Sequence, residues 1–263
     1  VNSGRNVVAS DSDGRYRLEG GGNRALVWIN VPGDCQPVGS FWRWADGAKG
    51  ADFGLAKRAE PKDFCFVQIT DAHLGRDDLL REFAGHLNQL DVPIAFVVNT
   101  GDLVGGVDVV APDKAREQFD RYLSAAAAFT VPLWNLPGNH EHVATNVAGA
   151  DKNHPHYGKG LYRQLLGPAY YAWDWGDVHF VALDGTSLPY QEKLGEEQLA
   201  WLRADLAFQP ADKPLVLFCH QSLAALRDAD ELAGVLQGRR VLGAFCGHLH
   251  RTFSTELAGF PVY

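Results

Sequence analysis

The sequence of 263 residues contains no methionine and only four cysteines. The cysteines are too few and too far apart for a disulfide scaffold, and no CxxC pair occurs. Cys65, Cys219 and Cys246 lie inside apolar runs, so we predict that they are buried thiols. Because Val1 stands where a methionine would begin translation, we expect the native chain to start elsewhere.

Basic charge and long apolar runs are also scarce. With 24 Lys and Arg against 32 Asp and Glu, the formal net charge is -8, which argues against nucleic-acid polymers or anionic membranes as partners. No window approaches the apolar length of a membrane-spanning helix, and the N-terminal segment lacks a signal-peptide core. We therefore predict a soluble chain without a membrane span, in which any phosphate is attracted by a local positive centre. The sequence leaves the oligomeric state open.

The first part of the chain has a β-type pattern. From Val1 to about Lys57 there is no helical periodicity, and short apolar runs are separated by Asp-Gly, Gly-Gly-Gly and Pro-Gly turn signals. The runs are Val7–Ala9, Tyr16–Leu18 and Ala25–Ile29. We predict a small all-β sandwich domain over residues 1–58 that takes no part in catalysis, with the charged stretch Ala56–Asp63 as the linker.

Residues 63–263 alternate between apolar strands and helices, which is typical of an α/β domain. Buried strands are predicted at Phe64–Thr70, Ile94–Thr100, Leu133–Leu136, Leu215–Cys219 and Val241–Cys246, with a hairpin formed by Tyr170–Trp173 and Val178–Leu183. Helices are predicted at Asp77–Leu90, Asp113–Phe129, Glu196–Phe208 and Asp230–Leu236. In the first helix, the pattern predicts one apolar face made of Leu79, Leu80, Phe83, Leu87 and Leu90.

Side chains of metal-ligand types directly follow the apolar strands. In open α/β sheets the site lies outside the carboxyl ends of the strands, so we expect these segments to converge in space. The segments are Asp71-Ala72-His73, Gly101-Asp102, Gly138-Asn139-His140-Glu141, His220 and Gly247-His248-Leu249-His250.

Each of these residues has an ordinary structural alternative, such as a helix cap at Asp71 or a satisfied core histidine at His220. Taken together, however, two Asp, one Asn and four His form a mixed oxygen and nitrogen set that suits Mn, Fe or Zn. The set exceeds what one ion needs, so two divalent ions sharing a carboxylate is the economical interpretation. Glycines before Asp102, Asn139 and His248 allow sharp turns that bring short side chains inward.

The ordered motifs D-x-H, G-D, G-N-H-E, H and G-H-x-H resemble the signature of the calcineurin-like metallophosphoesterase family, from about Phe64 to the C-terminus. This resemblance implies an αββα fold of two packed β-sheets flanked by helices, with His140 as the catalytic histidine. It also implies a ligand set: Asp71, His73 and His250 for one ion, Asn139, His220 and His248 for the other, and Asp102 bridging both.

Two further features refine the resemblance. Gly105 stands where many members of the family have an acidic residue or Tyr, which together with His73 argues against a purple acid phosphatase, and paired phosphate-binding arginines like those of protein Ser/Thr phosphatases are lacking. The segments "ASDSDGRYRL" and "ALVWINVPGD" resemble transthyretin-like or carboxypeptidase-regulatory-like modules of bacterial phosphoesterases. That module favours an extracytoplasmic, periplasmic or secreted, protein over a cytoplasmic one.

Three functions are consistent with this sequence. The first is a phosphodiesterase acting on a small-molecule phosphoester through a metal-bridging hydroxide, because "QITDAHLG" and "YYAWDWGDVHFVALD" resemble the bacterial cyclic-nucleotide and phospholipid diesterase branch. The second is a phosphomonoesterase of broad specificity, since the same dinuclear site serves both reactions. The third is a non-catalytic scaffold, which the complete ligand set disfavours.

The stretch "HVATNVAGADKNHPHYGKG" after G-N-H-E lacks apolar periodicity and predicts a long polar loop. One interpretation is a solvated surface loop. The other is a substrate-binding segment, because the loop leaves directly from the predicted metal site and carries His142, His154 and His156.

Overall fold

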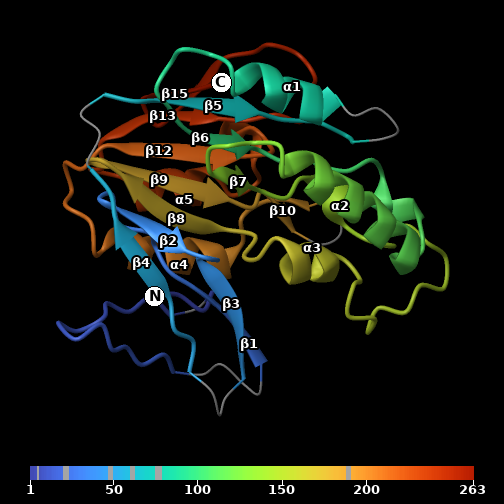
Figure 1. Cartoon of the computed structure of the whole chain (residues 1–263), viewed down its shortest axis with the longest axis horizontal. Helices are drawn as coiled ribbons and strands as arrows, with labels where there is room; N and C mark the ends of the chain where they lie inside the picture. The colour runs from blue at the N-terminus through green and yellow to red at the C-terminus, as the bar shows by residue number, and fades with distance from the viewer. Residues whose placement is uncertain (5, 20–23, 47–49, 60–62, 75–78, 188–190) are drawn as a thin grey trace.

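Two β-sheets lie face to face in the computed structural model, which describes residues 1–4, 6–19, 24–46, 50–59, 63–74, 79–187 and 191–263. The larger sheet has the strand order β14-β15-β13-β12-β9-β8, and the smaller one has the order β5-β6-β7 (Figure 1). The larger sheet comprises β8 (Tyr171–Trp175), β9 (Val178–Leu183), β12 (Leu215–Cys219), β13 (Val241–Phe245), β14 (Thr255–Leu257) and β15 (Phe260–Val262). The smaller sheet comprises β5 (Cys65–Ile69), β6 (Ile94–Asn99) and β7 (Leu133–Asn135).

The central strands run parallel to one another. β5, β6 and β7 pair in parallel, as do β9, β12 and β13, whereas β8 and β9 form the predicted antiparallel hairpin. Aromatic rings fill the space between the sheets: the Phe66 ring lies 5.6 Å from those of Phe96 and Phe218 and 5.8 Å from that of Phe180. Strands buried on both faces require the continuous apolar runs seen in the sequence.

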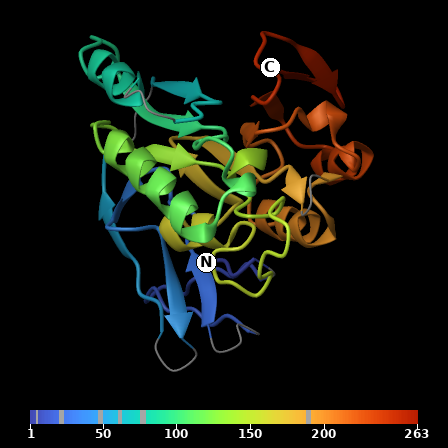
Figure 2. The ribbon, with the colours of Figure 1, turned by 90° about the vertical axis from the view of Figure 1, so that its right-hand side faces the viewer.

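Helices cover the outer faces of both sheets. α1 (Leu79–Leu87) and α2 (Pro112–Ala126) lie on one side, and α4 (Glu196–Leu206) and α5 (Ala229–Leu236) lie on the other, with the strands between them (Figure 2). A further helix, α3 (Gly160–Leu165), was not predicted. The predicted αββα architecture is confirmed. No helix among the described residues is long and apolar enough to cross a bilayer.

Two expectations about burial are wrong. Leu80, Ala84 and Leu87 form the buried stripe of α1, whereas three residues expected on the same face, Leu79, Phe83 and Leu90, are 66%, 39% and 55% exposed. Leu79 cannot join the stripe because it is adjacent to Leu80, and adjacent helical residues do not share one face. Asp77 and Asp78, in the expected first turn, lie outside the described residues. Cys65 is exposed at the start of β5, while the thiols of Cys219 and Cys246 are buried as predicted.

The N-terminal region contains two small antiparallel sheets, which pair β1 (Arg24–Trp28) with β3 (Trp42–Asp46) and β2 (Cys35–Val38) with β4 (Gly54–Lys57). The predicted run at Ala25–Ile29 corresponds to β1. The runs at Val7–Ala9 and Tyr16–Leu18 do not form strands, apart from one isolated bridge between Asn2 and Val7.

This region packs onto the edge of the larger sheet. Val31 forms a parallel bridge with Trp173 of β8, and the ring of Phe41 lies 5.0 Å from the rings of Trp134 and Tyr171. Trp28 is buried in the same cluster. The N-terminal strands lie beside β8 in Figure 1, so the region shares a core with the αββα body. Residues 60–62 of the expected linker lie outside the described part of the chain.

Candidate metal centre

The predicted ligands meet at the carboxyl ends of the parallel strands. Asp71 and His73 follow β5, and Asp102 follows β6, on the smaller sheet. His220 follows β12 and His250 follows β13, on the larger sheet. The site therefore lies where the two sheets face each other, and segments distant in sequence supply it.

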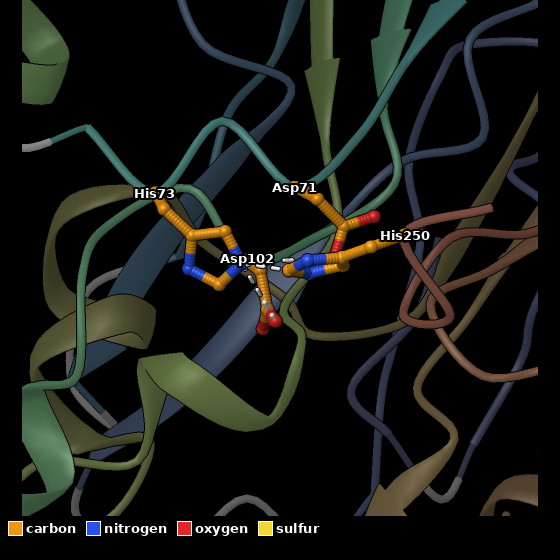
Figure 3. Close-up of side chains that lie close together, drawn as sticks. All are labelled: Asp71, His73, Asp102 and His250. Carbon is orange, nitrogen blue, oxygen red and sulfur yellow. Dashed lines mark hydrogen bonds and ion pairs between the residues drawn. The ribbon is translucent and has the colours of Figure 1, made fainter.

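Four side chains form the first cluster: Asp71, His73, Asp102 and His250 each offer one ligand atom, and these atoms lie within 4.8 Å of one another (Figure 3). His250 Nε2 lies 3.2 Å from Asp71 Oδ1 and 3.1 Å from His73 Nε2. His73 Nε2 lies 3.6 Å from Asp102 Oδ2. Imidazole nitrogens and carboxylate oxygens that face one point match the donor set of a divalent transition metal.

Asp102 also belongs to the second cluster, with ligand atoms of His220 and His248 again within 4.8 Å of one another. His220 Nε2 lies 3.1 Å from Asp102 Oδ2 and 3.2 Å from Asn139 Oδ1. On the other side of its ring, His220 Nδ1 lies 3.0 Å from the carbonyl oxygen of Thr100. A carbonyl only accepts, so this contact fixes the proton on Nδ1 and turns Nε2 toward the cluster.

The surroundings shift the pKa of His73 in the first cluster and that of His220 in the second in opposite directions. Burial lowers the pKa of His73, and the nearby carboxylates only partly oppose it. Burial also disfavours charge on His220, but its hydrogen bond to Asp102 outweighs burial and raises the pKa of His220. For Asp102, burial would raise the pKa, but the contact with His220 leaves it lowered. The carboxylate of Asp102 is therefore ionised at the centre of the site, as a metal ligand must be.

The backbone at these strand ends is strained. Asp71, His73, Asp102, His248 and His250 all have positive φ angles, of 53°, 39°, 52°, 71° and 50°. Such conformations cost non-glycine residues roughly 1–3 kcal/mol each and persist only where the surroundings enforce them. The Asp71 carboxylate accepts the His248 backbone N–H at 2.9 Å, which joins the loops after β5 and β13. Concentration of strain in the predicted ligands indicates a functional site.

Close backbone approach explains the glycines beside the ligands. A Cβ atom at Gly138 would lie 2.6 Å from the backbone nitrogen of Asp102, and one at Gly247 would lie 2.6 Å from Asp71 Oδ2. Both distances are shorter than van der Waals contact allows, so any side chain at these positions would push the ligand loops apart.

Glu141 is a structural member of the site that the sequence did not reveal. Its buried carboxylate accepts backbone N–H groups of Gly138 at 2.6 Å, Leu103 at 2.8 Å and Asp102 at 3.0 Å. Burial, and then the charge of Asp102, raise the pKa of Glu141 to about 7. This one side chain ties the loop after β6 to the loop after β7. Its only signal in the sequence is the fourth letter of G-N-H-E.

His140 lies at the edge of the cluster. Its backbone N–H donates to Asp102 Oδ1 at 2.9 Å, and its Nε2 lies 3.9 Å from Asp102 Oδ2. Its ring centroid is 4.6 Å from that of His73. The side chain is 34% exposed, while Nδ1 is buried and has no hydrogen-bond partner among the described atoms. His140 is thus close enough to reach a substrate held at the cluster and is not itself enclosed by it.

The long loop after G-N-H-E is closed at its base, where Val143 and Gly158 exchange backbone hydrogen bonds of 2.9 and 3.0 Å. His142 is completely buried, and burial, followed by the charges of Lys159 and Arg163, lowers the pKa of His142 to about 3. His142 is therefore a neutral interior side chain, which could meet substrate only if the loop opened.

Three further loop residues have partners within the protein. Lys159 is buried, with Nζ 2.6 Å from Asp184 Oδ1. The rings of His154 and His156 lie 5.0 Å apart and contact each other. The structure does not bring them into the ligand clusters, so their role in substrate binding stays a prediction.

Comparison with known proteins agrees with this geometry. The model of the calcineurin-like phosphoesterase family matches residues 65–252. The chain belongs to this family. It is therefore a phosphoester hydrolase with the α/β metallophosphoesterase fold, and its His and Asp clusters are typical metal-binding clusters of that family.

Several relatives carry functional names. The chain is 27% identical to the 3′,5′-cyclic adenosine monophosphate phosphodiesterase of Haemophilus influenzae, over 78% of this chain and 76% of the relative. It is 26% identical to a cAMP/cGMP dual specificity phosphodiesterase of Mycobacterium tuberculosis, over 76% and 66%. A solved phosphopantetheinyl hydrolase of Mycobacterium tuberculosis superposes with a TM-score of 0.45 at 15% identity, over 76% of this chain and 88% of that one.

Proposed function

We propose that this protein is a phosphodiesterase that hydrolyses cyclic nucleotides at a centre of two divalent metal ions. The observation that carries the proposal is the position of Asp102, whose carboxylate belongs to both clusters. The named relatives support a cyclic nucleotide as the substrate class.

The donor set fits two ions. One would be held by Asp71, His73, His250 and Asp102, and the other by Asn139, His220, His248 and Asp102. Nitrogen and oxygen donors in this proportion suit Mn, Fe or Zn. When bound, such a pair would supply positive charge for the phosphoryl oxygens and lower the pKa of a bound water toward neutrality.

The chain's own contribution to the chemistry is proton delivery. Opening a 3′,5′-cyclic phosphate expels a sugar alkoxide, which is a poor leaving group unless it is protonated. His140 presents Nε2 toward the cluster and is partly exposed, so it can donate a proton to that oxygen. The backbone N–H of His140 donates to Asp102 Oδ1 at 2.9 Å, which anchors His140 to the shared aspartate.

A substrate panel tests the proposal. The metal-free protein is loaded with Mn²⁺ and offered 3′,5′-cAMP, 3′,5′-cGMP, bis-p-nitrophenyl phosphate and p-nitrophenyl phosphate, with nucleotide products separated by chromatography. We expect metal-dependent conversion of cAMP or cGMP to the nucleoside monophosphate, without further conversion to the nucleoside. Turnover of the monoester alone would favour the phosphomonoesterase. A protein that bound two ions and hydrolysed none of these compounds would be a scaffold.

We also propose that residues 1–58 form an accessory region of transthyretin-like type, packed on the catalytic body but without a part in catalysis, and that the protein works outside the cytoplasm. The resemblance of the N-terminal segments supports the first point, and the occurrence of such modules in bacterial phosphoesterases supports the second. Fractionation of the native host, with the protein detected by antibody, would test the location.

A further inference from the structure

A short hairpin of β10 (Thr186–Ser187) and β11 (Gln191–Glu192) lies beside the second cluster. Its last residue, Glu192, places Oε1 3.5 Å from Nε2 of His248. Nothing in the sequence motifs marks this carboxylate, which comes from outside the strand-end segments that supply the ligands.

We propose that Glu192 is a positioning residue for His248, accepting a hydrogen bond from Nε2–H so that Nδ1 is presented to the second ion. The inference rests on the proposed dinuclear site. A metal-binding imidazole uses one nitrogen for the ion and donates its other N–H to a partner that fixes the ring orientation and the tautomer.

The other histidines of the site support this division of roles. His220 already shows it, with Nδ1 on the carbonyl of Thr100 and Nε2 facing Asp102. His250 also turns Nε2 inward, 3.2 Å from Asp71. His248 differs, because its Nε2 faces a carboxylate that belongs to neither cluster. Only Nδ1 of His248 is then left for an ion.

The hairpin holds Glu192 in a defined place. At one end, Thr186 N–H donates to Asp184 Oδ1 at 3.2 Å, and that carboxylate is paired with the buried Lys159. After the hairpin, the backbone N–H of Gly195 donates to Asp228 Oδ2 at 2.8 Å. The carbonyl of Glu192 itself accepts the N–H of Arg227 at 2.9 Å. The backbone of Glu192 is therefore held both by its pairing with Thr186 and by Arg227, which leaves the extended side chain within reach of His248.

The expected effect is moderate. The Glu192 side chain is 44% exposed, and the 3.5 Å contact is longer than a good hydrogen bond, so water screens part of the interaction. Removal of a carboxylate that orients a ligating histidine typically weakens metal binding by roughly 10- to 100-fold. We expect the lower part of that range.

The test is a calorimetric titration of Mn²⁺ into metal-free wild type, Glu192→Gln and Glu192→Ala. We expect Glu192→Ala to weaken the second ion by about 10-fold and to leave the first unchanged, while Glu192→Gln, whose amide oxygen still accepts Nε2–H, loses less. Glu196→Gln, which removes an exposed carboxylate from the first turn of α4, is the matched control and should bind both ions like wild type. At saturating Mn²⁺, kcat should stay within about twofold in all variants, because Glu192 does not contact the reacting atoms.

Unchanged second-ion affinity in Glu192→Ala, or an equal loss in Glu196→Gln, would overturn the inference. A large fall in kcat that Mn²⁺ does not restore would also overturn it, since it would place Glu192 on the substrate. If wild type itself bound fewer than two ions, the proposed function would fail and this inference with it.

Discussion

The two halves of the metal centre differ in how firmly the protein holds them. On the first side, the His250 side chain is 59% exposed and that of His73 is 26% exposed. On the second side, His248 is 31% exposed, but His220 is completely buried and hydrogen-bonded through both nitrogens, so this side has one fully enclosed histidine and the first side has none. A preorganised, buried set of donors loses less entropy on binding than a mobile one. We therefore expect the second ion to be tightly held and the first to exchange.

The largest effect should come from the residue that the two halves share. Asp102→Asn removes the bridging charge while keeping a similar shape, so both ions should bind weakly and turnover should fall by roughly 10³-fold or more. Metal analysis by mass spectrometry after gel filtration measures the ions directly. Retention of two ions with near-normal turnover would show that Asp102 is not the bridge.

Removing one histidine from each side sharpens the comparison. His220→Ala should abolish tight binding of the second ion, because it removes a predicted ligand of that ion and leaves the buried Asp102 carboxylate and the Asn139 side chain without their His220 partner. His250→Ala should weaken only the first ion, by roughly 10- to 100-fold, and excess Mn²⁺ should restore much of the activity. Equilibrium dialysis against graded Mn²⁺ distinguishes the two variants. If both variants lost Mn²⁺ affinity to the same extent, the expected difference in affinity between the two ions would be wrong.

We expect His140 to affect the rate of hydrolysis and not the binding of either metal ion. His140→Ala should slow hydrolysis of 3′,5′-cAMP by about 10²-fold while sparing bis-p-nitrophenyl phosphate, whose leaving group needs no proton. Both ions should remain bound, and metal analysis provides that control. Equal losses on both substrates would assign His140 to binding instead.

The last effect concerns stability rather than activity and involves His179, a buried histidine outside the site. Its Nδ1 lies 2.6 Å from Asp174 Oδ1 and its Nε2 lies 2.9 Å from Asp205 Oδ2, so neither nitrogen is left for a metal. Burial opposes the charged form, but these two hydrogen bonds outweigh it and raise the pKa of His179 to about 9.

A raised pKa in the folded protein means that stability depends on the bound proton. The contribution of His179, of the order of 3 kcal/mol, should be fully present below the unfolded pKa of 6.5 and lost as the pH rises through about 9. Urea unfolding of wild type and His179→Gln between pH 6.5 and pH 10 measures it. The free energy of unfolding should fall with pH more steeply in wild type, and parallel curves would contradict this account.

The sequence predicted the strands and their polar ends because both depend on local patterns. Leu215–Cys219 is apolar throughout and forms β12 with the predicted bounds, and His220 follows it into the site. Glu141 was missed because its partners are backbone N–H groups of Asp102 and Leu103, which are distant in sequence and carry no side-chain signal.

The N-terminal strands were harder to predict for a related reason. β2 and β4 are four-residue strands with the sequences CQPV and GLAK, in which apolar and polar residues do not alternate, so no strand pattern is visible in the sequence. The packing of Val31 on Trp173 depends on tertiary contacts, which no local pattern encodes. Glu192 escaped notice likewise, since only the folded hairpin brings it to His248.

The most direct test of the account is whether Asp102 joins two ions. Electron paramagnetic resonance of the Mn²⁺-loaded protein reports coupling between neighbouring ions, independently of any substrate. We predict a spin-coupled Mn²⁺ pair in wild type that Asp102→Asn abolishes. One ion per chain, or two ions without coupling, would contradict a shared dinuclear centre.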